Sequence, residues 1–444
     1  MQNRTRRRLT GPQVILLGFI VLVTAGALLL MLPISSKDRT VTPFIDALFT
    51  SVSAGCVTGL VVKDTQTSWS LFGQIIILFL IQIGGMGVLT MTTFFTKIMG
   101  RNIDIRSRAA MQEAVSAPNM GDIAKLTEFI VKGTILFEGL GAVLVMPVFI
   151  KDFGVAKGIW YSIFMSISAF CNAGFDLLGS AGGECSSLTF YADNALVNIV
   201  FIVLILTGGL GFLTWDDIRT HKFKFKKYST QSKIILVSEI FLIVIPALYF
   251  YVFELAGHPQ GERILEALFS AVSPRTAGFN TVDYNEFSGS GIAITIILML
   301  IGGAPGSTAG GMKITTVAIL WAAMISVFRR EKAPALFKRR ITQDTVLNAV
   351  AIFLLDMHLF LIGAIAIATI EKLPLMATLF ECGSAVATVG LTMGITSTLG
   401  TASKLILIFI MYGGRVGGLT LVFAATGRTN AIYDKYPTDK VAVG

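Results

Sequence analysis

Four windows of this 444-residue chain repeat one pattern, and this internal repeat constrains the fold more than any other feature. Each window contains Leu or Ile followed by Phe, a Ser followed by Ala or Pro, and a final Gly followed by Leu or Phe. The windows are ALFTSVSAGCVTGL (47–60), SIFMSISAFCNAGF (162–175), ALFSAVSPRTAGF (267–279) and TLFECGSAVATVGL (378–391). Their glycines, Gly59, Gly174, Gly278 and Gly390, are 115, 104 and 112 residues apart. The pattern predicts four structural units of similar size, the third of them one residue shorter within the window.

The composition places these units in a membrane. Hydrophobic residues make up 54% of the chain and charged residues 14%, with a mean hydropathy of +0.74. Soluble domains average about 25% charged residues, so a soluble enzyme of this length would lack the polar surface that its core requires. The composition also excludes a secreted disulfide scaffold, a disordered chain and most nucleic-acid binders. The four cysteines form no Cys-x-x-Cys pair, which argues against a structural metal site.

Eight segments are long and apolar enough to cross a hydrocarbon core of ~30 Å. They are 12–33, 70–96, 124–150, 194–215, 233–254, 290–328, 346–370 and 402–425. Four shorter segments, at 43–58, 158–173, 262–277 and 374–389, lie between each odd-numbered span and the next. We expect these to be re-entrant helices. The predicted fold is an all-α polytopic membrane protein with four span–re-entrant loop–span repeats in pseudo-fourfold symmetry around one ion pore.

The basic residues predict the orientation of these spans. Of 36 Lys and Arg residues, 24 fall in five clusters: 4 before residue 10, 5 in 97–125, 6 in 219–233, 6 in 329–340 and 3 after 427. Each cluster flanks long apolar stretches, which is typical of cytoplasmic loops. This placement predicts a cytoplasmic N-terminus and C-terminus, re-entrant helices that enter from outside, and membrane lipid rather than nucleic acid as the surroundings of the basic loops.

The repeats also predict the organisation of the chain into domains. The expected parts are a basic cytoplasmic N-terminus (1–11), repeat 1 (12–110), repeat 2 (111–228), repeat 3 (229–340), repeat 4 (341–428) and a cytoplasmic C-terminus (429–444).

The end of each re-entrant helix is suited to a cation. A helix of ~12 residues descends ~18 Å, and its C-terminal end carries about half a negative charge. The residues that follow would present backbone carbonyls, which replace the hydration shell of K⁺ in channel filters. The predicted filter residues are Val57, Thr58, Gly59, Leu60, Asn172, Ala173, Gly174, Phe175, Thr276, Ala277, Gly278, Phe279, Thr388, Val389, Gly390 and Leu391. They include no carboxylate, which favours a monovalent ion. The alternative is that these glycines only let helices pack closely.

A second glycine pattern lies in the even-numbered spans. Each carries a Gly-Gly pair, and we expect Gly84, Gly208 and Gly413 to serve close helix packing. The sixth span differs because residues 302–313, GGAPGSTAGGMK, hold glycines, a proline and hydroxyls that cannot sustain a helix in lipid. This stretch predicts an intramembrane break, whose alternative is a mere packing kink. Arg415 in the eighth span is a costly intramembrane charge and therefore a functional candidate.

The V-T-G, N-A-G, T-A-G and T-V-G sequences within four span–loop–span units resemble the Trk/Ktr/HKT superfamily of potassium transporters. With eight spans and a compact length, the chain looks most like the membrane subunit of the bacterial Ktr system. The resemblance implies K⁺ as the transported ion, bound at the filter carbonyls. Glycine at all four filter positions goes with K⁺ selection in this superfamily, whereas serine at the first goes with Na⁺ permeation.

The resemblance also implies a gate beneath the filter. Its residues would be Gly302, Gly303, Ala304, Pro305, Gly306, Ser307, Thr308, Ala309, Gly310, Gly311, Lys313 and Arg415. Arg415 would bond to loop carbonyls and oppose cation passage, although snorkelling or structural pairing is the alternative. Lys313 would cap loop carbonyls.

Further implications concern partners. The resemblance implies a homodimer in a bacterial cell membrane, seated on a cytosolic octameric RCK-type ring that binds nucleotide, with ATP opening and ADP closing the pathway. The basic loops at 219–227 and 329–340 are candidate docking surfaces, unless they only determine topology. Na⁺ stimulation is known in the Ktr family, but no residue here indicates it. No organic cofactor is expected in this chain.

Three other functions compete with a gated K⁺ pathway. A coupled monovalent-cation carrier and the K⁺-binding subunit of a P-type pump remain open. A membrane enzyme is disfavoured because HExxH, GxGD and nucleophile-elbow patterns are missing from the sequence. The intramembrane residues Glu138, Glu239, Asp356 and His358 would form buried pairs or face the dimer interface.

Overall fold

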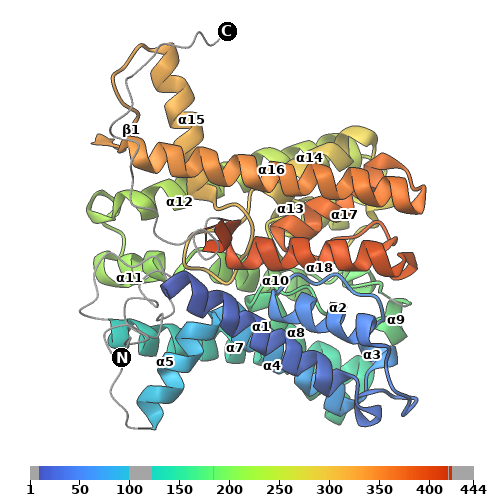
Figure 1. The fold of residues 1–444 in the computed structure, drawn as a ribbon. Helices are drawn as coiled ribbons and strands as arrows, with labels where there is room; N and C mark the ends of the chain where they lie inside the picture. The colour runs from blue at the N-terminus through green and yellow to red at the C-terminus, as the bar shows by residue number, and fades with distance from the viewer. Residues whose placement is uncertain (1–9, 100–122, 184, 419, 423–444) are drawn as a thin grey trace.

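The computed structural model describes residues 10–99, 123–183, 185–418 and 420–422, and these are mostly helical (Figure 1). Four long helices begin the four units: α1 (Gly11–Leu30), α7 (Ile123–Phe153), α12 (Thr230–Tyr249) and α16 (Gln343–Glu371). Each is long and apolar enough to cross a membrane, counting the turn Phe250–Glu254 that continues α12. They correspond to the first, third, fifth and seventh predicted spans. The predicted termini and the domain boundaries near 110 and 428 lie outside the described residues.

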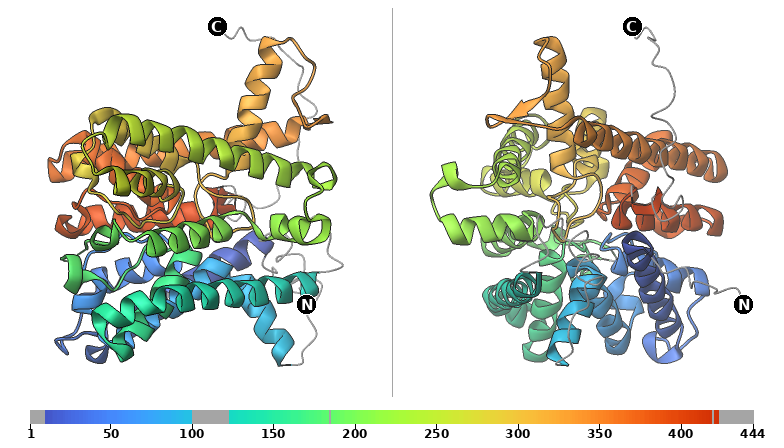
Figure 2. Two further views of the ribbon diagram at one scale, coloured as in Figure 1. Left: turned by 180° about the vertical axis from the view of Figure 1, so that it is seen from behind. Right: turned by 60° about the vertical axis from the view of Figure 1, so that its left-hand side comes forward.

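The next four helices are short. They are α2 (Phe44–Gly55), α8 (Val155–Phe170), α13 (Gln260–Val272) and α17 (Leu375–Ala387). Three of them start directly after a proline, which lacks the N–H that a helix start leaves unpaired. Each packs against the long helix that precedes it. In the right-hand view of Figure 2, the units follow one another around a common centre in chain order.

Three of the four helices that complete the units begin with a side-chain cap. Ser70 accepts a hydrogen bond from Gly73 N (3.3 Å) before α4 (Leu71–Met86), and Asn194 accepts one from Val197 N (3.2 Å) before α10 (Ala195–Gly209). Ser288 does the same before α14 (Gly289–Leu300), with Gly291 N at 3.1 Å. Each cap satisfies a backbone donor that the first helical turn leaves free. Helix α18 (Thr401–Val416) completes the fourth unit.

The even-numbered spans are not continuous helices, a feature that the sequence analysis did not anticipate at 70–96, 194–215 and 402–425. Helix α5 (Val88–Ile98) is bent by 95° from α4, and α11 (Phe212–His221) by 97° from α10. Helix α18 ends at Val416. The breaks fall at Gly87, Gly211 and Gly417, whose φ angles are 86°, 84° and 88°. Glycine adopts this left-handed conformation without a steric penalty, so the same turn interrupts three units.

The sixth predicted span is broken as expected. Residues 301–313 separate α14 from α15 (Ile314–Phe328), and α15 projects away from the rest of the bundle (Figure 1). The strands β1 (Ala335–Leu336) and β2 (Arg339–Arg340) form an antiparallel hairpin after α15. Among the described residues, four helices could cross a membrane alone, or six if each bent pair counts as one span.

Short elements connect these helices. They are α3 (Thr65–Ser68), α9 (Gly179–Gly182) and the single turns Pro33–Ser35, Thr189–Tyr191, Phe225–Lys227, Tyr284–Glu286 and Thr396–Thr398.

The first and last units contact each other, so the chain closes on itself. Lys404 of α18 forms an ion pair with Asp46 of α2 at 2.9 Å, and Tyr412 donates a hydrogen bond to Leu16 O at 2.7 Å. Buried apolar residues of the first unit also join those of the third and fourth in one core cluster, among them Val23 and Phe49. The core therefore surrounds the centre on which all four short helices converge.

The Gly-Gly pairs provide close packing between helices, as the sequence predicts, but in the fourth unit the tight contact is at Gly414 and not at Gly413. A Cβ added to Gly84, Gly208 or Gly414 would overlap a carbonyl oxygen at the end of the neighbouring short helix: Gly55, Phe170 or Val386, respectively. Gly413 has only ordinary contacts at 3.6 Å. Aligned on the glycines at the breaks, Gly414 is the counterpart of Gly84 and Gly208.

This packing predicts a stability effect for Gly84→Ala. The added methyl group would overlap Gly55 O and lie 2.8 Å from Gly55 C, and backbone cannot move aside as a flexible side chain can. We expect the free energy of unfolding to fall by about 1–3 kcal/mol. Thermal unfolding of the purified chain in detergent measures it. Gly139→Ala is the control, because nothing lies within 4 Å of a Cβ at Gly139; equal stabilities of the two variants would contradict the packing argument.

Candidate functional site

The structure brings the four repeat glycines together in one closed ring. A Cβ on Gly59 would lie 3.1 Å from Gly174 Cα and 3.2 Å from Gly390 Cα, and one on Gly278 would lie 3.1 Å from Gly174 Cα and 3.2 Å from Gly390 Cα. Each glycine also abuts the carbonyl oxygen of the residue that precedes the next glycine in the ring. These oxygens belong to Ala173, Ala277, Val389 and Thr58 for Gly59, Gly174, Gly278 and Gly390. The contacts run in one direction around the ring, and all sixteen predicted filter residues are buried.

The backbone of the four segments alternates in handedness. The glycines have φ angles of 92°, 69°, 79° and 98° in chain order. The residue two positions before each glycine is also left-handed: Val57 (59°), Asn172 (59°), Thr276 (71°) and Thr388 (51°). The residue between them is not. Alternating left- and right-handed residues turn successive peptide groups towards the same side, unlike an extended strand. Glycine adopts the left-handed conformation readily, whereas the non-glycine residues adopt it at a cost in strain.

A serine at the C-terminal end of each short helix, or directly after it in the case of Ser273, braces the segment that follows, and sequence reasoning assigned these serines no role. Ser53 and Ser384 accept hydrogen bonds from the N–H groups of Gly59 (3.1 Å) and Gly390 (2.9 Å). Ser168 donates to Phe175 O at 2.7 Å, and Ser273 donates to Phe279 O. The signal that could have revealed them is the Ser-Ala or Ser-Pro pair, which recurs in every window. These bonds hold the segments in a conformation that they would not keep alone.

Residues 302–313 form a loop that packs against this ring. The base of the loop is closed by hydrogen bonds from Gly302 N to Met312 O (2.8 Å) and from Ile314 N to Gly303 O (3.1 Å). Thr308 Oγ1 donates to Phe170 O, the end of α8, at 3.2 Å. A Cβ on Gly310 would overlap Thr388 Oγ1, so the loop lies directly against the fourth segment.

The loop is also tied to the break between α10 and α11. Three backbone hydrogen bonds make this connection: Ala304 N to Gly209 O (2.9 Å), Thr308 N to Gly208 O (3.2 Å) and Phe212 N to Gly306 O (2.8 Å). A fourth, from Gly311 N to Gly414 O (3.2 Å), links the loop to α18. The loop is therefore an ordered element held by two neighbouring units.

Arg415 joins the loop to the first unit. Its guanidinium donates hydrogen bonds to Thr308 O of the loop and to Gly84 O and Gly85 O at the end of α4, the last at 3.1 Å. In the alignment on the break glycines, Arg415 takes the position of Gly85 and Gly209. A long cation thus replaces a glycine in one unit of four, and its charge sits among carbonyl oxygens beside the loop.

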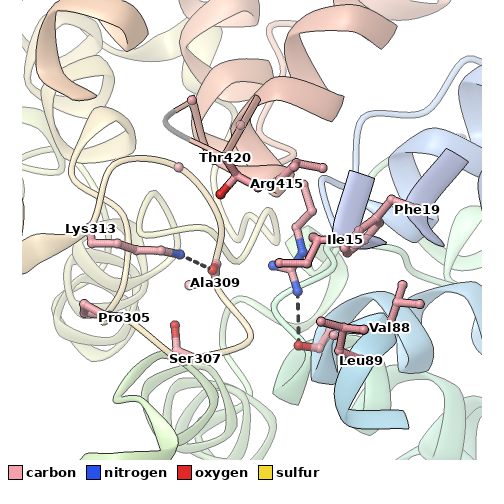
Figure 3. Close-up of a pocket in the computed structure, with 18 of the residues that line it drawn as sticks. Ile15, Phe19, Val88, Leu89, Pro305, Ser307, Ala309, Lys313, Arg415 and Thr420 are labelled. Carbon is pink, nitrogen blue, oxygen red and sulfur yellow. Dashed lines mark hydrogen bonds between the residues drawn. The ribbon is translucent and has the colours of Figure 1, made fainter. Parts of the chain in front are cut away.

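Lys313 lies on the other side of the loop from Arg415 (Figure 3). Its Nζ donates to Ala309 O (2.7 Å) and reaches Gly310 O (3.4 Å), which is the capping contact that the sequence suggested. A cavity of about 330 Å³ adjoins the loop and is lined by Arg415, Lys313 and the buried Asp356, among others. Seven of the twelve predicted gate residues line this cavity: Pro305, Gly306, Ser307, Ala309, Gly311, Lys313 and Arg415.

The other intramembrane polar residues have different surroundings. Glu138 accepts a hydrogen bond from Gln82 at 3.1 Å and contacts the Cys171 thiol at 3.7 Å. Glu239 forms a buried ion pair with Arg275, a residue that the sequence analysis did not single out. His358 is exposed, and its Nδ1 forms a hydrogen bond with Leu354 O of its own helix at 2.6 Å. Among the described residues no three His, Cys, Asp or Glu side chains are grouped as a metal site.

Comparisons with known proteins agree with one another. The model of the family described as "TrkH: Cation transport protein" matches residues 3–431. The chain is similar to the potassium/sodium uptake protein NtpJ of Enterococcus hirae, with 39% identity over 100% of this chain and 99% of that protein. It is also similar to the Ktr system potassium uptake protein B of Bacillus subtilis, with 37% identity over 98% and 97% of the two chains.

The fold resembles that of a crystal structure described as the potassium transporter TrkH from Vibrio parahaemolyticus. The TM-score is 0.76 at 18% sequence identity, over 96% of this chain and 87% of that one. At this identity the likeness concerns the fold alone.

Proposed function

The chain belongs to the TrkH family of cation transport proteins, and we propose that it takes K⁺ up across the cell membrane through the ring of carbonyls at Gly59, Gly174, Gly278 and Gly390. Family membership makes it a membrane protein of the Ktr/Trk kind, which agrees with the resemblance in the sequence. Its relatives are named as uptake proteins and not as enzymes. The single observation that carries the proposal is the closed ring in which each glycine abuts a carbonyl of the next segment.

The proposed architecture is four units around one pore. Each consists of a long helix, a short re-entrant helix, the filter segment and a second span that breaks midway. The breaks at Gly87, Gly211 and Gly417 and the loop between α14 and α15 occupy corresponding positions. Irregular backbone at membrane depth is tolerated where protein or a water-filled cavity surrounds it. A central pore below the ring would provide such a place for all four breaks, and we propose for the repeats the boundaries given in the sequence analysis.

K⁺ selection is proposed to come from the carbonyls of Val57 to Leu60 and the three corresponding segments. They replace the hydration shell of the ion, and their number and positions determine for which ion the lost hydration is best replaced. The serine braces support this role because they hold the carbonyls in place. The short helices add the negative ends of their dipoles.

We propose that the loop at 302–313 and Arg415 form the gate. Arg415 places a positive charge beside the loop and next to the cavity, where a passing cation would meet it. The loop is held by backbone hydrogen bonds that could be exchanged for water when it moves aside. Opening therefore requires the loop to move. Either the hydrogen bond from Arg415 to Thr308 O breaks, or Arg415 moves with the loop.

Regulation is proposed to come from a partner. The relatives named after the Ktr system suggest a regulatory subunit, and an octameric RCK-type ring that binds ATP or ADP is the partner we propose, with a homodimer of this chain seated on it. The basic residues of 219–227 and 329–340 offer contacts on what we propose to be the cytoplasmic side. The β1–β2 hairpin carries Arg339 and Arg340, which are exposed there.

The first test is uptake of K⁺ and Na⁺ by wild-type protein. Cells lacking their own K⁺ uptake systems would express the chain together with its candidate ring subunit, and influx of each ion would be measured at equal concentration. We expect K⁺ influx to exceed Na⁺ influx clearly. Absence of K⁺ uptake, with the protein present in the membrane, would reject the proposal in favour of a pump subunit. Uptake that requires a second ion in fixed ratio would indicate a coupled carrier.

A further inference from the structure

The third filter segment is built differently from the other three. It is one residue shorter, and it contains Pro274 and Arg275 directly after the bracing serine. Counted back from each glycine, Arg275 takes the position that Cys56, Cys171 and Ala387 hold in the other segments. Three units therefore have a small side chain where the third has the longest basic one.

The shorter segment also closes differently onto its helix. In the other units the N–H before the glycine bonds to the carbonyl of the bracing serine five residues back. These bonds are Thr58 N to Ser53 O (2.7 Å), Ala173 N to Ser168 O (2.8 Å) and Val389 N to Ser384 O (2.8 Å). In the third unit, Ala277 N bonds to Ser273 O only four residues back, at 3.0 Å. Pro274 can donate no backbone hydrogen bond, so this segment has a different local support.

Arg275 supplies a contact that the other segments lack. Two of its guanidinium nitrogens face the two carboxylate oxygens of Glu239 on α12. Arg275 is 4% exposed and Glu239 5% exposed, so the pair is shielded from water. A two-point contact between a planar guanidinium and a carboxylate fixes orientation as well as distance. The pair therefore ties the residue before Thr276 to a long helix of the same unit.

We propose that the Glu239–Arg275 pair positions the third filter segment and thereby sets how strongly the ring prefers K⁺ over Na⁺. This inference rests on the proposed function. The preference depends on where four sets of carbonyls stand, and the third set follows directly after Arg275. Loosening that one attachment lets Thr276 and Ala277 carbonyls approach a smaller ion. Arg275 touches no transported ion and acts as a positioning residue.

The ion pair between Asp46 and Lys404 is the matched control. It also joins two helices, at 2.9 Å, and both of its side chains are largely buried. It involves the start of α2 and the start of α18, far along both helices from the glycine ring. Loss of this pair should change stability without changing ion preference.

The test uses the double variant Glu239→Met/Arg275→Met in the full chain, expressed with the ring subunit. Replacing both members of a buried pair with apolar residues of similar size is often neutral for stability, so the fold is expected to persist. We expect the ratio of K⁺ to Na⁺ uptake to fall by about tenfold, which corresponds to ~1.4 kcal/mol. This ratio does not depend on how much protein reaches the membrane. The control Asp46→Asn/Lys404→Met should keep the wild-type ratio.

A second variant decides the matter if the double variant does not fold. Arg275→Lys retains the charge pair but makes one contact in place of two, and we expect the ratio to fall by about two- to threefold. A wild-type ratio in every folded variant would overturn the inference while leaving the proposed function intact. Lack of K⁺ preference in the wild type would instead count against the proposed function itself.

Discussion

Arg415→Ala is expected to raise K⁺ flux at least about tenfold and to weaken its dependence on nucleotide. The guanidinium opposes a permeating cation by charge: two unit charges about 4 Å apart repel by ~4 kcal/mol at an effective dielectric constant of 20. The same group binds the loop at 302–313 through Thr308 O and the end of α4 through Gly84 O and Gly85 O. Alanine removes the repulsion and these three attachments together.

The measurement is initial K⁺ influx under ATP and under ADP, normalised to the amount of protein in the membrane. Arg263→Ala is the matched control, because Arg263 also donates to a backbone carbonyl, Tyr251 O at 2.8 Å, but lies at the start of α13 away from the loop. A chain lacking residues 303–311 should behave like Arg415→Ala, since the constriction is then missing. Unchanged flux in both altered chains would show that neither the loop nor Arg415 forms the gate.

Much of this site could be predicted from the sequence because it is repeated. One window of Ser, Ala, Gly and Phe would be indistinguishable from a packing motif, whereas four at regular spacing located all four segments of the ring. The intramembrane loop was predictable for a different reason. A stretch with five glycines and a proline cannot remain helical in lipid, wherever the rest of the chain goes.

The breaks in the other even-numbered spans were missed because the glycines at 84–87, 208–211 and 413–417 were interpreted as sites of helix packing. Gly87, Gly211 and Gly417 stand in apolar stretches, and one glycine inside a helix costs only ~1 kcal/mol. Their left-handed conformation follows from neighbours that the local sequence does not show. For example, a Cβ on Gly211 would lie 2.8 Å from Pro305 O of the gate loop. Tertiary contact, rather than local preference, turns these glycines into breaks.

Partners distant in sequence were missed for a similar reason. Glu239 and Arg275 are 36 residues apart, one on α12 and the other in the segment after α13, so nothing in either neighbourhood predicts their contact. The serine braces were visible as a repeated residue, but their role depends on segments that fold back over their own helix. Which of Gly413 and Gly414 packs tightly likewise depends on which one faces Val386 O. Matching the Gly-Gly pairs of the repeats selects Gly413, whereas matching the break glycine Gly417 selects Gly414, the residue that makes the contact.

Gly59→Ser is expected to abolish most of the preference for K⁺ over Na⁺. Gly59 has a φ of 92°, a conformation that side chains disfavour. A Cβ there would lie 2.5 Å from Ala173 O and close to the Cα atoms of Gly174 and Gly390. The substitution must therefore move two neighbouring segments as well as its own. The carbonyl positions on which K⁺ selection is proposed to depend would change on three sides of the ring at once.

The measurement is the ratio of K⁺ to Na⁺ uptake, for which we expect a loss of about tenfold or more, the equivalent of at least ~1.4 kcal/mol. Gly139→Ser in α7 is the control, since nothing lies within 4 Å of its added Cβ and its backbone is helical. Gly390→Ser should resemble Gly59→Ser, because its Cβ would lie 2.9 Å from Gly59 Cα. This expectation requires the four glycines of the ring to act as one unit. If Gly59→Ser and Gly390→Ser changed the ratio of K⁺ to Na⁺ uptake in opposite directions, or if Gly59→Ser kept the wild-type ratio, ion preference would be set elsewhere in the chain.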